Sequence, residues 1–390
     1  MPASFTAEAT AARAILDRLV AFDTTSRNSN LALIDWVEAY LGARGVPTWR
    51  IASADGAKAN LVARVGPEAA GGIVLSGHTD VVPVDGQPWT SDPWTVVERD
   101  GRLYGRGVAD MKSFLALALA HVDKALAAAM DRPLILAFSY DEEVGCLGAP
   151  HMIARLGEFV PPPALCVVGE PTDMRVLSGH KGIRSFIVEV TGREAHSSQI
   201  HQGVSAIAEA LKLMNFVLKM GEEAAAAADP TTPFQPPGAT MTIGIVEGGT
   251  AVNILARRCM FIWDLRCPTA GEPDIYEARF RAFTAEVDAG IKARAPEGGV
   301  VVTRRSDTPP FAPTLDSAAE HFVRALTGDN SVQVASYAAE AGLFQRAGIP
   351  TVLCGPGSIL QAHQPDEWIE ESQIAEGAAF MDRLIRRLSA

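Results

Sequence analysis

Short apolar segments alternate with helical segments along most of this 390-residue sequence, and this order restricts the fold more than any other feature. The apolar segments have the length of β-strands and cover residues 60–65, 72–76, 134–140 and 165–168. A helical pattern is clearest at residues 113–129, and it is also present at residues 5–22 and 31–44. Strands that alternate with helices form a largely parallel sheet covered on both faces. We therefore expect an α/β domain with a mostly parallel sheet flanked by helices.

The middle of the chain has a different order of elements. Strand patterns are expected at residues 183–190, 240–246, 258–265 and 300–304, and helices at residues 204–219 and 273–293. This βαββαβ order is typical of a two-layer α+β sandwich. An Ala- and Pro-rich stretch at residues 220–238 is expected to be a loop. The alternating pattern then returns and ends in a helix at residues 371–388. The sequence thus predicts a discontinuous domain, residues 1–181 and 307–390, interrupted by an inserted domain at residues 182–306.

Charge and composition exclude several classes of protein. Lys and Arg number 34 against 46 Asp and Glu, a net charge of −12, so the chain lacks the basic surface that nucleic acid binding requires. The five cysteines are scattered without a CxxC pair, which argues against a disulfide framework or a zinc ribbon. The most apolar long run, residues 115–130, contains charged residues, so no membrane partner is expected. The N-terminal region has an amphipathic pattern unlike a signal peptide, and we expect a cytoplasmic protein.

Acidic or imidazole side chains follow three of the apolar segments. The chain reads Ser-Gly-His-Thr-Asp at residues 76–80, Tyr-Asp-Glu-Glu at residues 140–143 and Gly-Glu-Pro at residues 169–171. Two further candidates, Asp110 and His363, follow glycine-rich turns. Each residue alone could be a helix cap or a turn residue. Because the carboxyl ends of parallel strands lie along one edge of a sheet, we expect these side chains to converge there.

A cluster of this composition predicts a metal centre. So many carboxylates repel one another unless a cation neutralises them, and nitrogen and oxygen ligands without thiolate suit zinc, manganese or cobalt at a catalytic site. Five candidate ligands exceed the three usual for one catalytic zinc, and they suit two metals that share a bridging carboxylate. Asp80, two residues from His78, could hold the ring nitrogen that faces away from the metal. The adjacent Glu142 and Glu143 should diverge, so that one binds metal while the other takes a proton from water.

Four sequence blocks, residues 77–83, 105–112, 141–143 and 169–172, resemble the signature blocks of the dinuclear-zinc aminoacylase and exopeptidase family. Acetylornithine deacetylase, succinyl-diaminopimelate desuccinylase and carboxypeptidase G2 belong to this family. Three further stretches, residues 248–253, 354–357 and 361–367, are most similar to its acetylornithine deacetylase branch. The resemblance implies a metal-binding α/β domain with an inserted dimerisation and lid domain, and hence a homodimer.

The resemblance also implies a set of metal ligands for two zinc ions, with cobalt as an alternative. His78 and Glu170 complete the shell of one metal, and Glu143 and His363 complete that of the other. Asp110 bridges the two. Family members often have a cis peptide bond after the bridging aspartate, here between Asp110 and Met111.

The remaining roles follow from the same resemblance. Glu142 is the expected general base and Asp80 the residue that orients His78. The block at residues 192–198 is similar to one whose histidine reaches the active site of the partner subunit, where His196 would donate a hydrogen bond to an oxyanion. Its alternative is a loop histidine that caps the helix near Val204.

Substrate contacts are expected from four residues of this sequence. Asn253 and Arg266 lie where relatives contact the substrate carboxylate, although Arg266 could instead form a salt bridge with Asp264. Lys181 could serve the same purpose, and Gly357 is a further candidate in its turn. The sequence departs from the family pattern at Ala256 and residues 199–201, where proline is usual, and at Ser113, where glycine is frequent.

The expected activity is hydrolysis of N-acetyl-L-ornithine to L-ornithine and acetate, a step of arginine synthesis. The same chemistry on N-succinyl-diaminopimelate, N-acetyl-citrulline or a dipeptide remains open. A catalytically inactive binding protein is a distant alternative, since every ligand and base position is filled. A dinucleotide-binding oxidoreductase is disfavoured because the GxGxxG fingerprint is missing at residues 105–110.

Overall fold

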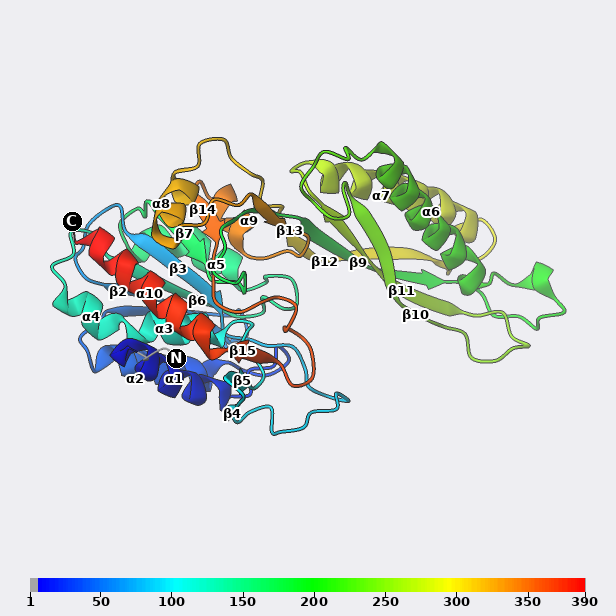
Figure 1. The fold of residues 1–390 in the computed structure, drawn as a ribbon. Coiled ribbons are helices and arrows are strands. Elements are labelled where there is room, and N and C mark those ends of the chain that lie inside the picture. The colour runs from blue at the N-terminus through cyan, green and yellow to red at the C-terminus, as the bar shows by residue number, and fades with distance from the viewer. Residues whose placement is uncertain (1–5, 390) are drawn as a thin grey trace. The chain divides into compact units, whose positions relative to one another are not determined.

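The computed structural model describes residues 6–389, which form two compact units (Figure 1). The first unit contains the described residues up to Gly179, the segment Pro313–Val334 and the described residues from Ala339. The second consists of His180–Ala312 and Ala335–Ala338. Each unit has its own hydrophobic core.

The first unit is built on an eight-stranded sheet with the strand order β1-β2-β6-β3-β7-β14-β8-β13. The strands are β1 (Thr48–Ala52), β2 (Ala59–Val65), β3 (Ile73–His78), β6 (Leu134–Ser139), β7 (Leu165–Val168), β8 (Leu177–His180), β13 (Gln333–Ala335) and β14 (Thr351–Leu353). Strand β3 is parallel to both β6 and β7, and β14 is parallel to β7. Strands β1, β2 and β8 join antiparallel. The α/β fold class is confirmed, with antiparallel strands on both sides of a parallel centre.

Helices and a small second sheet complete this unit. The helices are α1 (Ala7–Val20), α2 (Leu31–Gly42), α3 (Lys112–Ala120), α4 (Val122–Ala127), α5 (Ala149–Phe159), α8 (Ala318–Thr327), α9 (Ala341–Arg346) and α10 (Glu371–Leu388). Helix α3 is buried along its whole length and packs against α1, α10 and β3. A three-stranded sheet contains β4 (Val97–Arg99), β5 (Arg102–Tyr104) and β15 (Trp368–Glu370).

The helix expected at residues 113–129 is two helices. His121 separates them with non-helical dihedral angles (φ −91°, ψ 1°), and its ring Nδ1 lies 2.7 Å from the carbonyl oxygen of Leu117. A side chain that bonds the preceding turn in this way competes with continuation of the helix. The N-terminal helix begins at Ala7, where the Thr6 side chain caps it by accepting from the main-chain nitrogen of Ala9; residue 5 lies outside the described residues.

The second unit is the expected two-layer sandwich. Its elements follow in the order β9 (Gly182–Thr191), α6 (Ala206–Ala227), β10 (Thr240–Gly248), β11 (Arg258–Cys267), α7 (Glu272–Lys292) and β12 (Gly299–Thr308), with a 3₁₀ turn η1 (Ile200–Gln202) before α6. The antiparallel sheet has the order β10-β11-β9-β12, and both helices pack on one of its faces (Figure 1). Phe186 stacks on Trp263, and Phe280 of α7 packs against Trp263 in a tilted arrangement between the two layers. The predicted βαββαβ order is confirmed.

The loop expected at residues 220–238 begins later than the sequence suggested. Helix α6 continues to Ala227, because the run Glu-Glu-Ala-Ala-Ala-Ala consists of strong helix formers. The prediction was wrong for these eight residues and holds for the Pro-rich part that follows. Among residues 6–389, no helix combines the length and the apolar character that crossing a membrane would need.

Candidate metal centre

The candidate ligands lie at the carboxyl ends of three neighbouring strands. His78 is the last residue of β3, Glu142 and Glu143 follow β6, and Glu170 follows β7. Since β6, β3 and β7 are adjacent and parallel, their ends meet at one edge of the sheet. Two loops add Asp110, just before α3, and His363, before β15. The structure brings together all five ligands expected from the sequence.

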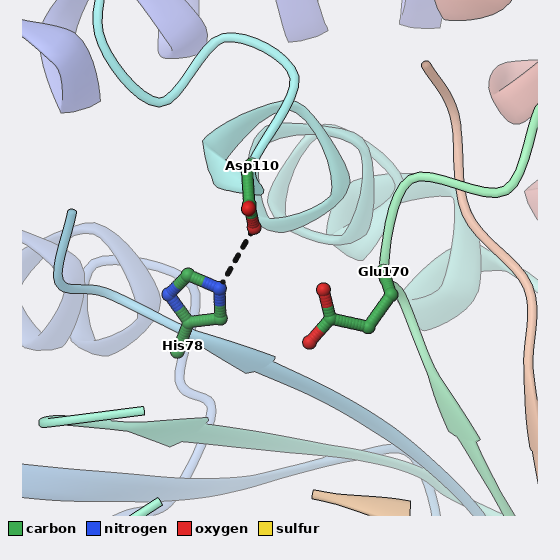
Figure 2. Close-up of side chains that lie close together, drawn as sticks. All are labelled: His78, Asp110 and Glu170. Carbon is green, nitrogen blue, oxygen red and sulfur yellow. Dashed lines mark hydrogen bonds and ion pairs between the residues drawn. The ribbon is translucent and has the colours of Figure 1, made fainter. Parts of the chain in front are cut away.

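One group of possible ligands consists of His78, Asp110 and Glu170 (Figure 2). His78 Nε2 lies 3.0 Å from Asp110 Oδ1, and ligand atoms of all three residues lie within 4.8 Å of one another. The three side chains are buried, and the Glu170 carboxylate points toward the other two. Within the described part of the chain, Glu170 Oε1 is a buried oxygen without a hydrogen-bond partner. An unpaired buried carboxylate oxygen is costly, and a cation at this position would remove the cost.

A second group shares Asp110 with the first and adds Glu143 and His363. His363 Nε2 lies 3.0 Å from Glu143 Oε2 and 3.4 Å from Asp110 Oδ2. The two carboxylate oxygens of Asp110 therefore face different histidines, as a bridging ligand requires. The expected cis peptide bond between Asp110 and Met111 is present.

The protonation of this cluster reflects an excess of negative charge. Desolvation and the neighbouring carboxylates raise the pKa values of Glu142 and Glu170 well above their usual range. Desolvation and the charge of Asp110 raise the pKa of Glu143 to about 7. Hydrogen bonds with Asp110 and Glu143 raise the pKa of His363 to about 10. The raised pKa values mean that the site favours bound positive charge, which divalent cations can supply in place of protons. The ligand atoms are nitrogen and oxygen only, a set that fits zinc, cobalt or manganese.

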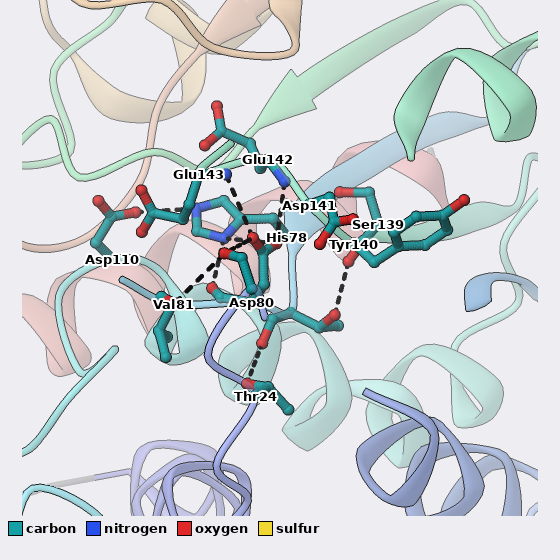
Figure 3. Close-up of polar contacts among 12 residues, drawn as sticks. Thr24, His78, Asp80, Val81, Asp110, Ser139, Tyr140, Asp141, Glu142 and Glu143 are labelled. Atoms are coloured by element: carbon teal, nitrogen blue, oxygen red, sulfur yellow. Dashed lines mark hydrogen bonds and ion pairs between the residues drawn. The ribbon is translucent and has the colours of Figure 1, made fainter. Parts of the chain in front are cut away.

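Asp80 holds His78 through its main chain rather than its side chain (Figure 3). The Nδ1 atom of His78 lies 2.9 Å from the carbonyl oxygen of Asp80, whereas the Asp80 carboxylate is 3.7 Å away. A carbonyl oxygen only accepts, so Nδ1 carries the proton and Nε2 faces the ligand position. The residue expected to orient the ring does so with a different atom.

The Asp80 carboxylate instead organises the loop that follows β6. It accepts hydrogen bonds from the main-chain nitrogens of Glu142 (3.1 Å) and Glu143 (3.3 Å), and from Ser26 Oγ (2.7 Å) (Figure 3). Beyond these bonds the two glutamates diverge. Glu143 contacts His363, while Glu142 Oε1 accepts from the thiol of Cys146 at 3.3 Å and belongs to neither ligand group.

Two candidate residues of the second unit, His196 and Asn253, lie on two adjoining loops. His196 is exposed, and its Nδ1 lies 2.8 Å from Ser198 Oγ. Asn253 is exposed as well, and its carbonyl oxygen accepts from the main-chain nitrogen of Ser197. A β-bridge between His196 and Ile254 joins the two loops. His196 and Asn253 therefore lie in one neighbourhood, and His196 does not cap α6, whose cap is Ser205.

The other expected substrate contacts have partners within their own unit. Arg266 Nε lies 3.1 Å from Asp264 Oδ2, the alternative that the sequence left open. Lys181 is buried, and its ammonium donates to the carbonyl oxygens of Pro236 (2.6 Å) and Gly238 (2.7 Å). This contact fixes the loop after α6, which is a structural role, and a role of Lys181 toward substrate stays a prediction.

Gly357 occupies a turn that only glycine fits easily. Its φ is 84°, and an added Cβ would lie 3.1 Å from Ile369. Its main-chain nitrogen donates to the side chain of Gln373, and its contact with substrate also stays a prediction.

Two buried acids near the centre were missed by the sequence analysis. Glu340, at the start of α9, accepts from Ser76 on β3 and Ser139 on β6. Glu367 binds the loop that carries Asp110. Each contacts residues more than 200 positions away, so no local spacing could have indicated it. For Glu367 the only signal was its place in the block at residues 361–367.

Comparison with known proteins shows the family and the fold of this chain. The sequence profile of peptidase family M20/M25/M40 matches residues 74–387. The chain therefore belongs to this family of metal-dependent amide hydrolases, which confirms the resemblance seen in the signature blocks. It is 32% identical to the acetylornithine deacetylase of Proteus mirabilis (strain HI4320) over 373 residues, 94% of this chain and 92% of that protein. It is 34% identical to the acetylornithine deacetylase of Myxococcus xanthus over 386 residues, covering 96% and 97%.

The fold is also found in solved structures of low sequence identity. An M20 family metallo-carboxypeptidase, Sso-CP2 from Sulfolobus solfataricus, superposes with a TM-score of 0.75 at 16% identity, over 97% of this chain and 99% of that one.

Proposed function

We propose that this protein hydrolyses N-acetyl-L-ornithine to L-ornithine and acetate, as a step of arginine synthesis. The observation that carries the proposal is a pair of ligand groups that share Asp110, next to a carboxylate, Glu142, that neither group uses. Such a pair suits metal-assisted hydrolysis of an amide. The acetylornithine deacetylases that resemble the chain over most of its length support the substrate.

Two divalent ions, zinc or cobalt, are the proposed cofactors. His78, Asp110 and Glu170 would hold one, and Asp110, Glu143 and His363 the other. When bound, the metals polarise the amide carbonyl and make a water molecule more acidic.

The protein's own groups would then move the proton and hold the substrate. Glu142 takes the proton from the attacking water and passes it to the leaving amine. The hydrogen bond from the Glu142 main-chain nitrogen to the Asp80 carboxylate keeps this base in place. His196 would donate a hydrogen bond to the developing oxyanion, and Asn253 and Arg266 would contact the substrate carboxylate.

The first unit is the proposed catalytic domain and the second the proposed dimerisation and lid domain. Strand β10 is at the edge of its sheet and exposes Ile245 and Val246. Helix α6 exposes Ile207, Leu211 and Leu218, which lie on one face at spacings of four and seven residues. An unpaired strand edge beside an apolar helix face favours pairing with a second copy of the chain.

The test is acetate release by zinc- or cobalt-loaded protein from N-acetyl-L-ornithine. N-Succinyl-diaminopimelate, N-acetyl-citrulline and a dipeptide serve as competing substrates, and metal-free protein as the blank. Turnover selective for N-acetyl-L-ornithine is expected. Turnover of another amide only would support the metal-assisted mechanism and contradict the proposed substrate. The cause would then be sought in the lid, where Ala256 and residues 199–201 depart from the family pattern. No turnover of any amide would contradict the proposal.

A further inference from the structure

The carboxylate of Glu367 accepts four hydrogen bonds from the loop that leads to Asp110. Oε2 accepts from Arg106 Nη1 at 2.7 Å and from the main-chain nitrogen of Gly107 at 3.0 Å. Oε1 accepts from the main-chain nitrogens of Ala109 (2.9 Å) and Asp110 (3.1 Å). A carboxylate has about four acceptor positions, so this one loop fills them.

The loop is held along its whole length. The carbonyl oxygen of Glu367 accepts from the main-chain nitrogen of Gly105, and the next residue, Trp368, pairs with Tyr104 in the small sheet. The contacts thus run from the end of β5 to the main chain of Asp110 itself. With its main chain fixed in this way, Asp110 can move its two carboxylate oxygens only by rotation about its side-chain torsions.

A second branch of this network reaches His363. Arg106 Nη2 donates to Gln87 Oε1 at 2.6 Å, and Gln87 Nε2 donates to the carbonyl oxygen of His363 at 2.9 Å. His363 also precedes Glu367 by only four residues. Glu367 and Arg106 are each 1% exposed, so solvent does not compete for the ion pair between them. One buried ion pair therefore connects the main chains of two ligands of the same metal group.

We propose that Glu367 is a positioning residue of the metal centre. It fixes the main chain of Asp110 directly and that of His363 through Arg106 and Gln87, and so sets the spacing of these two ligands. This inference rests on the dinuclear site of the proposed function. Because Asp110 belongs to both ligand groups, a shift of its main chain disturbs both ions, which is how groups behind the ligands control metal affinity.

The competing interpretation is that the Glu367–Arg106 pair only stabilises the fold. A purely structural pair would change the unfolding temperature and leave the ligand geometry of the folded molecules intact. A positioning residue changes the metal site in molecules that are still folded. The absorption bands of bound Co²⁺ distinguish the two, since they depend on ligand geometry.

The test compares Glu367→Gln with Glu370→Gln. Glutamine keeps the shape of Glu367, but its NH₂ group replaces one of the two acceptor oxygens and therefore faces two N–H donors of the loop in either orientation. Glu370 lies three residues after Glu367, at the end of β15, and its half-exposed carboxylate pairs with Arg102, so it is a matched control. Metal-free full-length protein is titrated with Co²⁺ and followed by visible absorption, at a temperature where circular dichroism shows each variant folded. We expect two equivalents in the wild type and the control, and binding about 10- to 100-fold weaker with altered bands in Glu367→Gln.

Folded Glu367→Gln with wild-type affinity and bands would overturn the inference. If this variant does not fold, Gln87→Met decides, because Gln87 is only half-buried and its loss breaks the branch to His363. Weaker binding of one of the two equivalents is then expected, and unchanged binding of both would overturn the inference. A wild-type protein that binds fewer than two ions would overturn it together with the dinuclear site. The titration involves no substrate, so its result can be interpreted even if the protein does not deacetylate N-acetyl-L-ornithine.

Discussion

Two adjacent glutamates receive different surroundings from the same loop. The main-chain nitrogens of Glu142 and Glu143 bind one carboxylate, that of Asp80, and this directs their side chains apart. Glu143 lies next to His363 and Asp110, the proposed bridging ligand, whereas Glu142 meets only the weak thiol donor of Cys146 among the contacts described above. Next to the proposed metal pair, a side chain outside both ligand groups is free to carry a proton.

Replacing Glu142 should therefore separate metal binding from turnover. Glu142→Gln keeps the size of the side chain and removes its capacity as a base, so we expect two bound metals and a kcat lower by about 10²- to 10⁴-fold. Metal content is measured by elemental analysis and turnover by acetate release. Glu158→Gln, at an exposed position of α5, is the matched control and should behave as the wild type. A near-normal rate in Glu142→Gln would refute the role of this residue.

The metal-free protein should lose stability as the pH rises. The folded-state pKa values of Glu143, about 7, and His363, about 10, both lie above the ordinary values of 4.5 and 6.5. Folding therefore takes up protons between these values, and the stability that these groups contribute at low pH is lost as the pH passes about 7 and then about 10. Urea unfolding in the presence of a chelator measures the effect. Metal-loaded protein should lack this loss, since metal replaces the protons. Equal or greater stability of the metal-free protein at high pH would contradict the assignment.

At the scale of elements, the site depends on how closely helix α3 approaches the ends of β3 and β7. Gly169 precedes the ligand Glu170, and an added Cβ there would lie only 2.1 Å from the ring of Phe114 on α3. Gly77, one residue before His78, is similarly close to Met111 and Leu115. Glycine at these positions lets the helix and the strand ends pack in contact.

Gly169→Ala should consequently weaken both fold and site. The methyl group forces Phe114 or β7 to move, and we expect a loss of about 1–3 kcal/mol of unfolding free energy together with weaker metal binding. Gly157→Ala is the control, because this helical glycine has nothing within 4 Å of an added Cβ and should gain about 0.5–1 kcal/mol. Denaturant unfolding of both variants decides the matter. A neutral Gly169→Ala would show that the helix is not held as closely as described.

The sequence predicted long elements well and short or distant ones poorly. Strands β3 and β6 were found because they are continuous apolar runs, buried at every residue, and β11 because its burial alternates along the strand. Strands β14 and β15 have three residues each, too few to show any period. The ligands were found because each follows an apolar segment or a glycine turn. Glu340 and Glu367 escaped because their partners lie far away in the sequence.

At the scale of the whole molecule, the candidate residues are divided between two units. All five proposed metal ligands and Glu142 lie in the first unit, while His196 and Asn253 lie in the second. Each unit has a separate core, so each can hold its own residues in place without the other. Under the proposed function, a complete active site combines the ligands of a first unit with His196 of a second unit. The family resemblance implies that this second unit belongs to the partner subunit.

Mixing two inactive variants should therefore restore activity. Glu142→Gln lacks the base and His196→Ala lacks the oxyanion donor, so each homodimer should be nearly inactive. If His196 acts across the dimer, a mixed dimer combines the intact base of one chain with the intact histidine of the other. After subunit exchange of equal amounts, half of the dimers are mixed and each has one complete site of two, so about a quarter of wild-type activity is expected. Acetate release before and after exchange measures the recovered activity.

The control variants test whether the recovery depends on dimer formation. Leu211→Glu, which places a charge on the exposed face of α6, should abolish the recovery by preventing pairing. Leu126→Glu, at a similarly exposed leucine of the first unit, should leave the recovery unchanged. No recovery in mixed dimers whose formation is verified by co-purification of differently tagged chains would place the action of His196 within its own chain.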